Sequence, residues 1–160
     1  INSLIGANNE MVDVYILEGT TRSTKTQELG LSYIERGKDV QKIRKEQRSL
    51  NSILEDFKEI PKIDFLSIDV EGAELDVLKG LNLKKFRPKV VLAEATYPET
   101  NIPNCDNWEP LLLEADYELV YLDGLNRFYM DNPTLEEKDN LKLPPNYFDN
   151  FIKFELIDAI

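Results

Sequence analysis

The sequence predicts an α/β fold, a partial Rossmann-like domain with a mainly parallel sheet and an antiparallel hairpin at its C-terminal end. Two mostly apolar runs, residues 63–68 and 89–95, are typical of strands covered on both faces. A helix is expected between them at residues 73–79. Residues 117–130, with the turn signal Asp123-Gly124, predict the hairpin. Strand–helix–strand units of this kind build parallel sheets with helices on both faces.

The N-terminal part is harder to interpret. A β-branched and aromatic run predicts a strand at residues 11–17. Residues 25–40 are ambiguous, because Gly30 and Gly37 interrupt any long helix. Residues 40–47 are expected to form a short, charged edge strand. The remaining elements are short: a helix at 50–57 capped by Ser49, helices at 108–114 and 134–141, and an apolar segment at 147–157.

Composition and charge exclude several classes of function. The chain has 160 residues, which is enough for one domain over residues 1–160. Its net charge of −11 opposes binding to nucleic acids and to anionic membranes. No apolar run approaches the roughly 18 residues that a membrane span needs. The basic residues at 38–48 are interpreted as a solvated face.

The absence of histidine restricts the chemistry further. Without it, Ser-His-Asp and Cys-His catalysis are excluded, and a general base must be a carboxylate, Lys or Tyr. Cys105 is the single cysteine, so there is no intrachain disulfide and no cysteine-based zinc site. Together with the lack of a signal-peptide pattern, this leads us to expect a cytoplasmic protein.

The acidic run from Asp69 to Glu74 is the densest candidate for chemistry. Asp69 ends a predicted buried strand, and ligands of open α/β sheets bind just outside such ends. Glu71 follows in the same loop, and Gly72 permits a tight turn or a close approach to a ligand. One carboxylate could act as a base, or the pair could orient substrate or hold a divalent cation. Glu74 is better explained as an acid in the first turn of a helix.

Glu94 ends the next predicted strand and is expected to lie near Asp69. Parallel neighbours bring their carboxyl ends to the same edge, so the two acids should face one crevice. The alternative is a hydrogen-bonded Glu94 that merely closes the strand. We therefore take Asp69, Glu71 and Glu94 as the candidate catalytic residues.

Three further residues are candidates for substrate binding: Tyr97, Asn126 and Arg127. Asn126 and Arg127 belong to the hairpin, where closing the turn is the simpler role for Asn126. Tyr97 and Trp108 could provide a stacking surface for a sugar or a purine, although packing is the favoured interpretation.

Several runs resemble the FkbM family of methyltransferases. Residues 63–74, followed by Leu78-Lys79-Gly80, are very close to the family's signature run, and residues 87–94 resemble its next strand. The other similar runs occur in the family's order: residues 49–54, 117–120, 126–129 and 143–149. The resemblance implies a class I methyltransferase fold. It also implies methyl transfer from S-adenosylmethionine to a hydroxyl, often of a sugar, a glycan or a secondary metabolite.

The cofactor-binding turn of that family has no clear match in this sequence. Its members open with a glycine-rich turn that holds the cofactor, and residues 6–10 do not fit it, since a strand follows them and the third glycine is missing. They are interpreted as a hairpin-like turn. We therefore expect a domain without its first two strands, in which Asp69 and Gly72 contact the cofactor and most other contacts lie outside the chain.

Two functions of different classes stay open. The first is an O-methyltransferase seen as its C-terminal part. The second is a non-catalytic binding module or subunit that associates with itself or with a separate N-terminal half, since an unpaired sheet edge invites pairing. A metal-dependent hydrolase is weaker because no histidine is available as a ligand.

Overall fold

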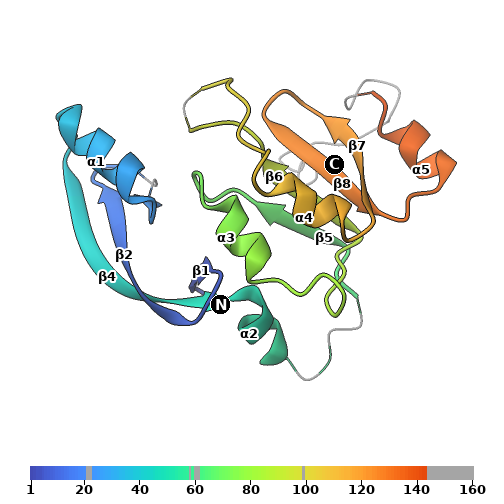
Figure 1. The fold of residues 1–160 in the computed structure, drawn as a ribbon, viewed down its shortest axis with the longest axis horizontal. Coiled ribbons are helices and arrows are strands. Elements are labelled where there is room, and N and C mark those ends of the chain that lie inside the picture. The colour runs from blue at the N-terminus through green and yellow to red at the C-terminus, as the bar shows by residue number, and fades with distance from the viewer. Residues whose placement is uncertain (21–22, 58, 60–61, 99, 144–160) are drawn as a thin grey trace, which may run out of the picture.

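The computed structural model describes residues 1–20, 23–57, 59, 62–98 and 100–143, which form two sheets of four strands each. In Figure 1 the first sheet, sheet A, is a curved arm beside the second, sheet B. The protein is therefore α/β as predicted, but its sheets are mixed. The apolar segment expected at 147–157 and the motif residues from 144 onward lie outside the described residues.

Sheet A is built on a long antiparallel ribbon of β2 (Glu10–Leu17) and β4 (Val40–Ser49). The short strands β1 (Leu4–Gly6) and β3 (Ser23–Thr24) complete the order β1-β4-β2-β3. The strand predicted at 11–17 is confirmed. The edge strand predicted at 40–47 is confirmed for most of its length, since residues 40–46 pair with β2 alone among the described strands. The short strand β1 pairs in parallel only with the C-terminal end of β4, from Gln47 to Ser49.

Residues 6–10 do not make a hairpin-like turn, because β4 lies between the two strands that they connect. The ambiguous segment contains the helix α1 (Gln27–Glu35), which includes Gly30. A Cβ at Gly30 would lie 2.3 Å from the ring of Tyr15, so glycine is what lets α1 approach sheet A. Gly37, with a φ of 72°, follows the helix end.

Sheet B has the order β5-β6-β8-β7. Its strands are β5 (Phe65–Ile68), β6 (Val90–Glu94), β7 (Tyr117–Leu122) and β8 (Asn126–Asp131). The β5–β6 pair is parallel, β8 is antiparallel to β6, and β7 and β8 form the predicted hairpin. The prediction of a mainly parallel sheet is thus wrong for the described residues. They contain a single strand–helix–strand unit in sheet B, and the earlier strands pair with one another in sheet A.

Four short helices belong to the C-terminal part: α2 (Leu50–Glu55), α3 (Glu74–Lys79), α4 (Glu109–Leu113) and α5 (Leu135–Asn140). All four were expected. The Ser49 side chain accepts a hydrogen bond from the Ser52 amide at 3.1 Å, which confirms the predicted cap of α2. None of the helices in the described part of the chain has the length and apolar character needed to cross a membrane.

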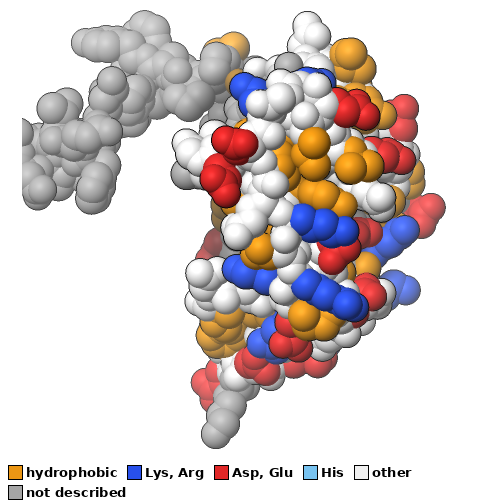
Figure 2. Space-filling view, turned by 90° about the vertical axis from the view of Figure 1, so that its left-hand side faces the viewer, with side chains coloured by type: hydrophobic (Ala, Val, Ile, Leu, Met, Phe, Trp, Pro, Cys, Tyr) orange, Lys and Arg blue, Asp and Glu red, His pale blue; other side chains and the backbone are white. Residues whose placement is uncertain are grey.

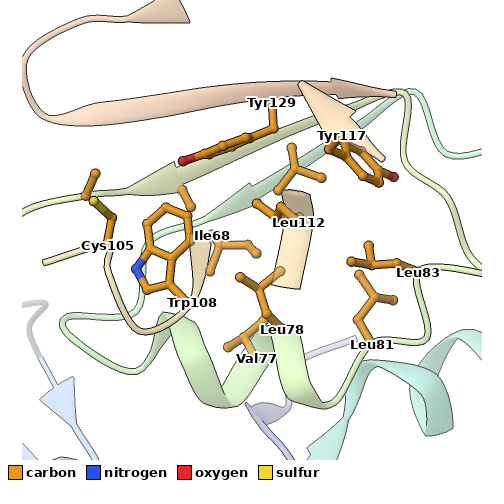
Figure 3. Close-up of a cluster of buried hydrophobic side chains, with 13 residues drawn as sticks. Ile68, Val77, Leu78, Leu81, Leu83, Cys105, Trp108, Leu112, Tyr117 and Tyr129 are labelled. Atoms are coloured by element: carbon orange, nitrogen blue, oxygen red, sulfur yellow. The ribbon is translucent and has the colours of Figure 1, made fainter. Parts of the chain in front are cut away.

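The main core lies between one face of sheet B and the helices α3 and α4. Figure 3 shows Val77 and Leu78 of α3 pointing towards Ile68 and the ring of Trp108. Val91, Ala93, Leu112 and Tyr129 are 0% exposed, so the centre of this layer is closed to bulk solvent. On the opposite face of sheet B, Phe65 and Leu92 are exposed or half-buried. The expectation of helices on both faces is therefore not met in the described residues. The core fixes the face of sheet B from which α3 and its preceding loop project.

The buried hydroxyl of Tyr117 makes the stability of this core depend on pH. It donates a 2.7 Å hydrogen bond to the carbonyl of Pro88, and burial raises the pKa of Tyr117 from 10.0 to about 12. Because the folded pKa is the higher one, the stabilisation is complete below pH 10 and is lost as the pH rises towards 12.

We predict that Tyr117→Phe is less stable than the wild type at pH 8 by about 1 kcal/mol, the net value of a hydrogen bond. That gap should close and then reverse between pH 10 and pH 12, since two pKa units correspond to about 2–3 kcal/mol, more than the hydrogen bond contributes. Urea unfolding over a pH series measures it, with Tyr97→Phe at an exposed position as the control. A gap that does not change with pH would contradict the assignment.

Candidate functional site

The four residues after β5, Asp69 to Gly72, form a loop that carries two carboxylates, and we call it the acid loop. It leads directly into α3. Glu71 has a φ of 52° and Gly72 a φ of 90°, so two successive residues are left-handed. This conformation is unfavourable for a residue with a side chain and persists where neighbouring contacts hold it.

Glu74 supplies such contacts from below the loop. Its Oε1 atom accepts hydrogen bonds from the amides of Val70 at 3.3 Å and Gly72 at 3.1 Å. The residue is 2% exposed, and burial raises the pKa of the Glu74 carboxyl although the backbone hydrogen bonds oppose the shift. The acid therefore does more than favour the helix dipole, which was the interpretation from sequence.

The strand register brings the predicted acids to one edge of sheet B. Ile68 of β5 lies opposite Ala93 of β6, so Asp69 and Glu94 follow paired residues on neighbouring parallel strands. Glu94 in turn lies opposite Asn126 of β8. Asp69 and Glu94 thus lie at the ends of neighbouring strands, as expected. Glu94 does not line the cavity beside Asp69, so a crevice shared by the two acids is not found in the described residues. Their catalytic roles stay a prediction.

A cavity of about 420 Å³ opens between the acid loop and sheet A. Asp69 and Glu71 line one side, and Ile5, Thr24 and Lys25 line the other. The Thr24 hydroxyl donates to the carbonyl of Glu71 at 3.4 Å, which ties the loop to sheet A. Asp69 is exposed.

Lys25 is the residue of this site that the sequence did not predict. Its side chain is 10% exposed, and its Nζ atom is 2.9 Å from a carboxylate oxygen of Asp76 in α3. The same ammonium donates to the carbonyl of Ile5 and to Oε1 of Gln47. It also lines a second cavity of about 410 Å³ between sheet A and α3. No local pattern marks this residue, because its partners come from three distant elements.

The other candidates have structural partners. Asn126 closes the hairpin turn, since its amide donates to Asp123 at 2.6 Å and its side-chain nitrogen donates to the same carboxylate at 3.0 Å. Arg127 pairs with Glu109 at 2.6 Å, and the Tyr129 hydroxyl donates to that carboxylate. These contacts hold α4 against the hairpin and give Arg127 a structural partner.

The two aromatic candidates differ in position. Tyr97 is 51% exposed in the segment after β6, whereas Trp108 is 1% exposed and packs edge-on against the ring of Tyr129. Packing is therefore confirmed for Trp108. Substrate contact by Tyr97 stays a prediction.

Charge on the face of sheet A is mixed. Figure 2, which faces this side, shows acidic and basic side chains interspersed without a large patch of one sign. Lys42 of β4, for example, lies 2.8 Å from Asp13 of β2. This supports the prediction of a solvated face for the basic residues at 38–48. In the described residues, no group of three or more acidic or cysteine side chains is arranged to hold a metal ion.

A sequence model of the methyltransferase FkbM domain matches residues 3–119. This match covers most of the chain and includes sheet A, of which the similar runs identified from sequence reached only Ser49. The chain belongs to the FkbM methyltransferase family. No curated protein and no solved structure matches it.

We predict that Lys25→Met destabilises the protein by about 1–3 kcal/mol, because Asp76 and the carbonyl of Ile5 lose a charged partner in a half-buried place. Methionine keeps much of the aliphatic stem, so the loss is mainly electrostatic. Lys42→Met is the matched control, since it breaks an ion pair between exposed side chains and should cost less. Urea unfolding of both variants measures the difference. Equal losses would show that Lys25 does not link sheet A to α3.

Proposed function

We propose that this member of the FkbM family is an S-adenosylmethionine-dependent O-methyltransferase whose acceptor is a hydroxyl of a sugar, a glycan or a secondary metabolite. The observation that carries the proposal is the acid loop at the carboxyl end of β5, in register with Glu94 of β6 and beside a cavity. In α/β proteins this edge of the sheet is the usual place for ligands. We further propose that the described residues are part of a Rossmann-like fold.

The cofactor fits the chemistry of this cavity. Its volume of about 420 Å³ is within the range of small-molecule sites. Asp69 would accept hydrogen bonds from the hydroxyl or ammonium groups that S-adenosylmethionine carries. A Cβ at Gly72 would meet no described atom closer than 3.9 Å, so the backbone there is open to a close approach. The glycine-rich turn of the family has no counterpart in the sequence, so Asp69 and Gly72 account for part of the contacts.

Within the proposal, S-adenosylmethionine supplies an electrophilic methyl group when bound. The residues of this chain position the acceptor and remove its proton. Asp69, Glu71 and Glu94 are the available bases at the edge, in a chain that has no histidine. A carboxylate that accepts the hydroxyl proton makes the acceptor oxygen a better nucleophile, and the rest of the rate gain comes from orientation.

The second candidate is a non-catalytic module, and the free edge of sheet B favours it. Among the described strands, β5 pairs with β6 alone, and its Phe65 is 53% exposed. An apolar strand of this kind can pair with another chain. The partner would be a second copy or a separate N-terminal half. A single cysteine suits the cytoplasm as the proposed location for either function.

We predict that Asp69→Asn or Glu71→Gln in the full-length protein lowers methyl transfer by about 10²–10⁴-fold, the usual value of a general base. Transfer of a labelled methyl group from S-adenosylmethionine to a panel of neutral sugars, glycans and hydroxylated metabolites measures it. Asp69→Asn should change the free energy of unfolding by less than about 0.5 kcal/mol, because Asp69 is exposed.

Asp64→Asn is the matched control for these variants. Asp64 is exposed and precedes β5, at the opposite end of the strand from the acid loop, so transfer should stay at the wild-type level. Equal losses of activity and stability in the Asp69 and Glu71 variants would mean that the acids are structural. A wild-type protein that neither binds S-adenosylmethionine nor transfers its methyl group would favour the module.

A further inference from the structure

Glu74 lies under the acid loop with no catalytic role assigned to it. We propose that Glu74 is a positioning residue whose carboxylate fixes the acid loop, so that Asp69 and Glu71 line the same cavity. This inference rests on the proposed function, because it gives the loop its purpose, but the contacts that carry it are independent of any ligand.

The first argument is the pattern of hydrogen bonds. A single atom, Oε1 of Glu74, accepts from the amides of Val70 and Gly72. These two residues flank Glu71, the residue of the acid loop that has a side chain and a left-handed backbone. Holding the amides on both sides of Glu71 to one oxygen prevents the peptide units from turning back to an extended conformation. The two hydrogen bonds thus hold Glu71 in its unfavourable left-handed conformation.

The second argument is burial. An ionised carboxylate is expensive to place at 2% exposure unless hydrogen bonds compensate for the lost water. The neighbouring buried positions of α3, Val77 and Leu78, are apolar and pack in the main core. An apolar side chain at position 74 would satisfy packing equally well and would leave two loop amides without a partner. The acid at position 74 is therefore explained by its hydrogen bonds to the loop amides and not by packing in the core.

The third argument is that the loop is also tied on its other side. The carbonyl of Glu71 accepts from the Thr24 hydroxyl of β3, while Glu74 binds the amides from α3. The acid loop is thus fixed between sheet A and the helix α3. Removing the Glu74 contacts frees one side, which should let Asp69 and Glu71 swing away from the cavity without unfolding the core.

The experiment compares Glu74→Met, Glu74→Gln and the wild type in the full-length protein. Methionine fills a similar volume without an acceptor of this strength, whereas glutamine keeps Oε1. Amide hydrogen exchange should show at least tenfold faster exchange of Val70 and Gly72 in Glu74→Met and wild-type exchange in Glu74→Gln. Calorimetry with S-adenosylhomocysteine as the probe should show at least tenfold weaker binding for the methionine variant and rescue by glutamine.

Val77→Ala is the control for general destabilisation, since Val77 is 3% exposed in the same helix and does not touch the loop amides through a hydrogen bond. It should lose stability while keeping loop exchange and probe affinity. Unchanged exchange at Val70 and Gly72 in Glu74→Met, or equal loss of affinity in Val77→Ala, would overturn the inference. A wild-type protein that does not bind the probe would instead count against the proposed function. The inference about Glu74 would still be tested, because amide exchange at Val70 and Gly72 is measured without a ligand.

Discussion

The parallel register of β5 and β6 is the constraint on which the candidate site depends. Pairing Ile68 with Ala93 places Asp69 and Glu94 at one edge, and a shift by one residue would turn every side chain of β5 to the other face of the sheet. The register is fixed by burial, because Ile68 and Ala93 both point into the buried layer between sheet B and the helices α3 and α4. The chemistry at the edge is therefore positioned by apolar packing behind it.

Apolar packing alone does not settle where the carboxylates of the acid loop point. Between Ile68 and Val77, the side chains of Val70 and Leu75 pack partly against the core, and polar contacts hold the backbone of the acid loop. Glu74 holds the amides from below, and Thr24 and Lys25 approach from sheet A. Both sheets therefore contribute to the site. The strand ends of sheet B position the acid loop, and residues of sheet A form the opposite wall of the cavity.

Features that depend on local sequence signals were predicted, and features that depend on partners distant in the sequence were missed. Strand β5, helix α3 and the β7–β8 hairpin were predicted because their signals are local, such as apolar runs and the Asp123-Gly124 turn. The pairing of β1 with the C-terminal end of β4 was not predicted, because the two strands are distant in the sequence. Lys25 was missed for the same reason. The ion pair of Arg127 with Glu109 was not predicted, because its partner lies 18 residues away in the sequence, and substrate contact by Arg127 stays a prediction.

The extent of the folded unit can also be argued from pairing. The family match ends at residue 119, within β7, yet β8 pairs with β6 from Val90 to Glu94. Without β8, the strand that carries Glu94 would become an edge, and Tyr129 would leave the ring of Trp108 uncovered. The ion pair of Arg127 with Glu109 holds the same two segments together on the polar side. Residues 120–131 are consequently part of the structure that positions Glu94, and a protein ending at the limit of the match would lose the strand that supports β6 on that side.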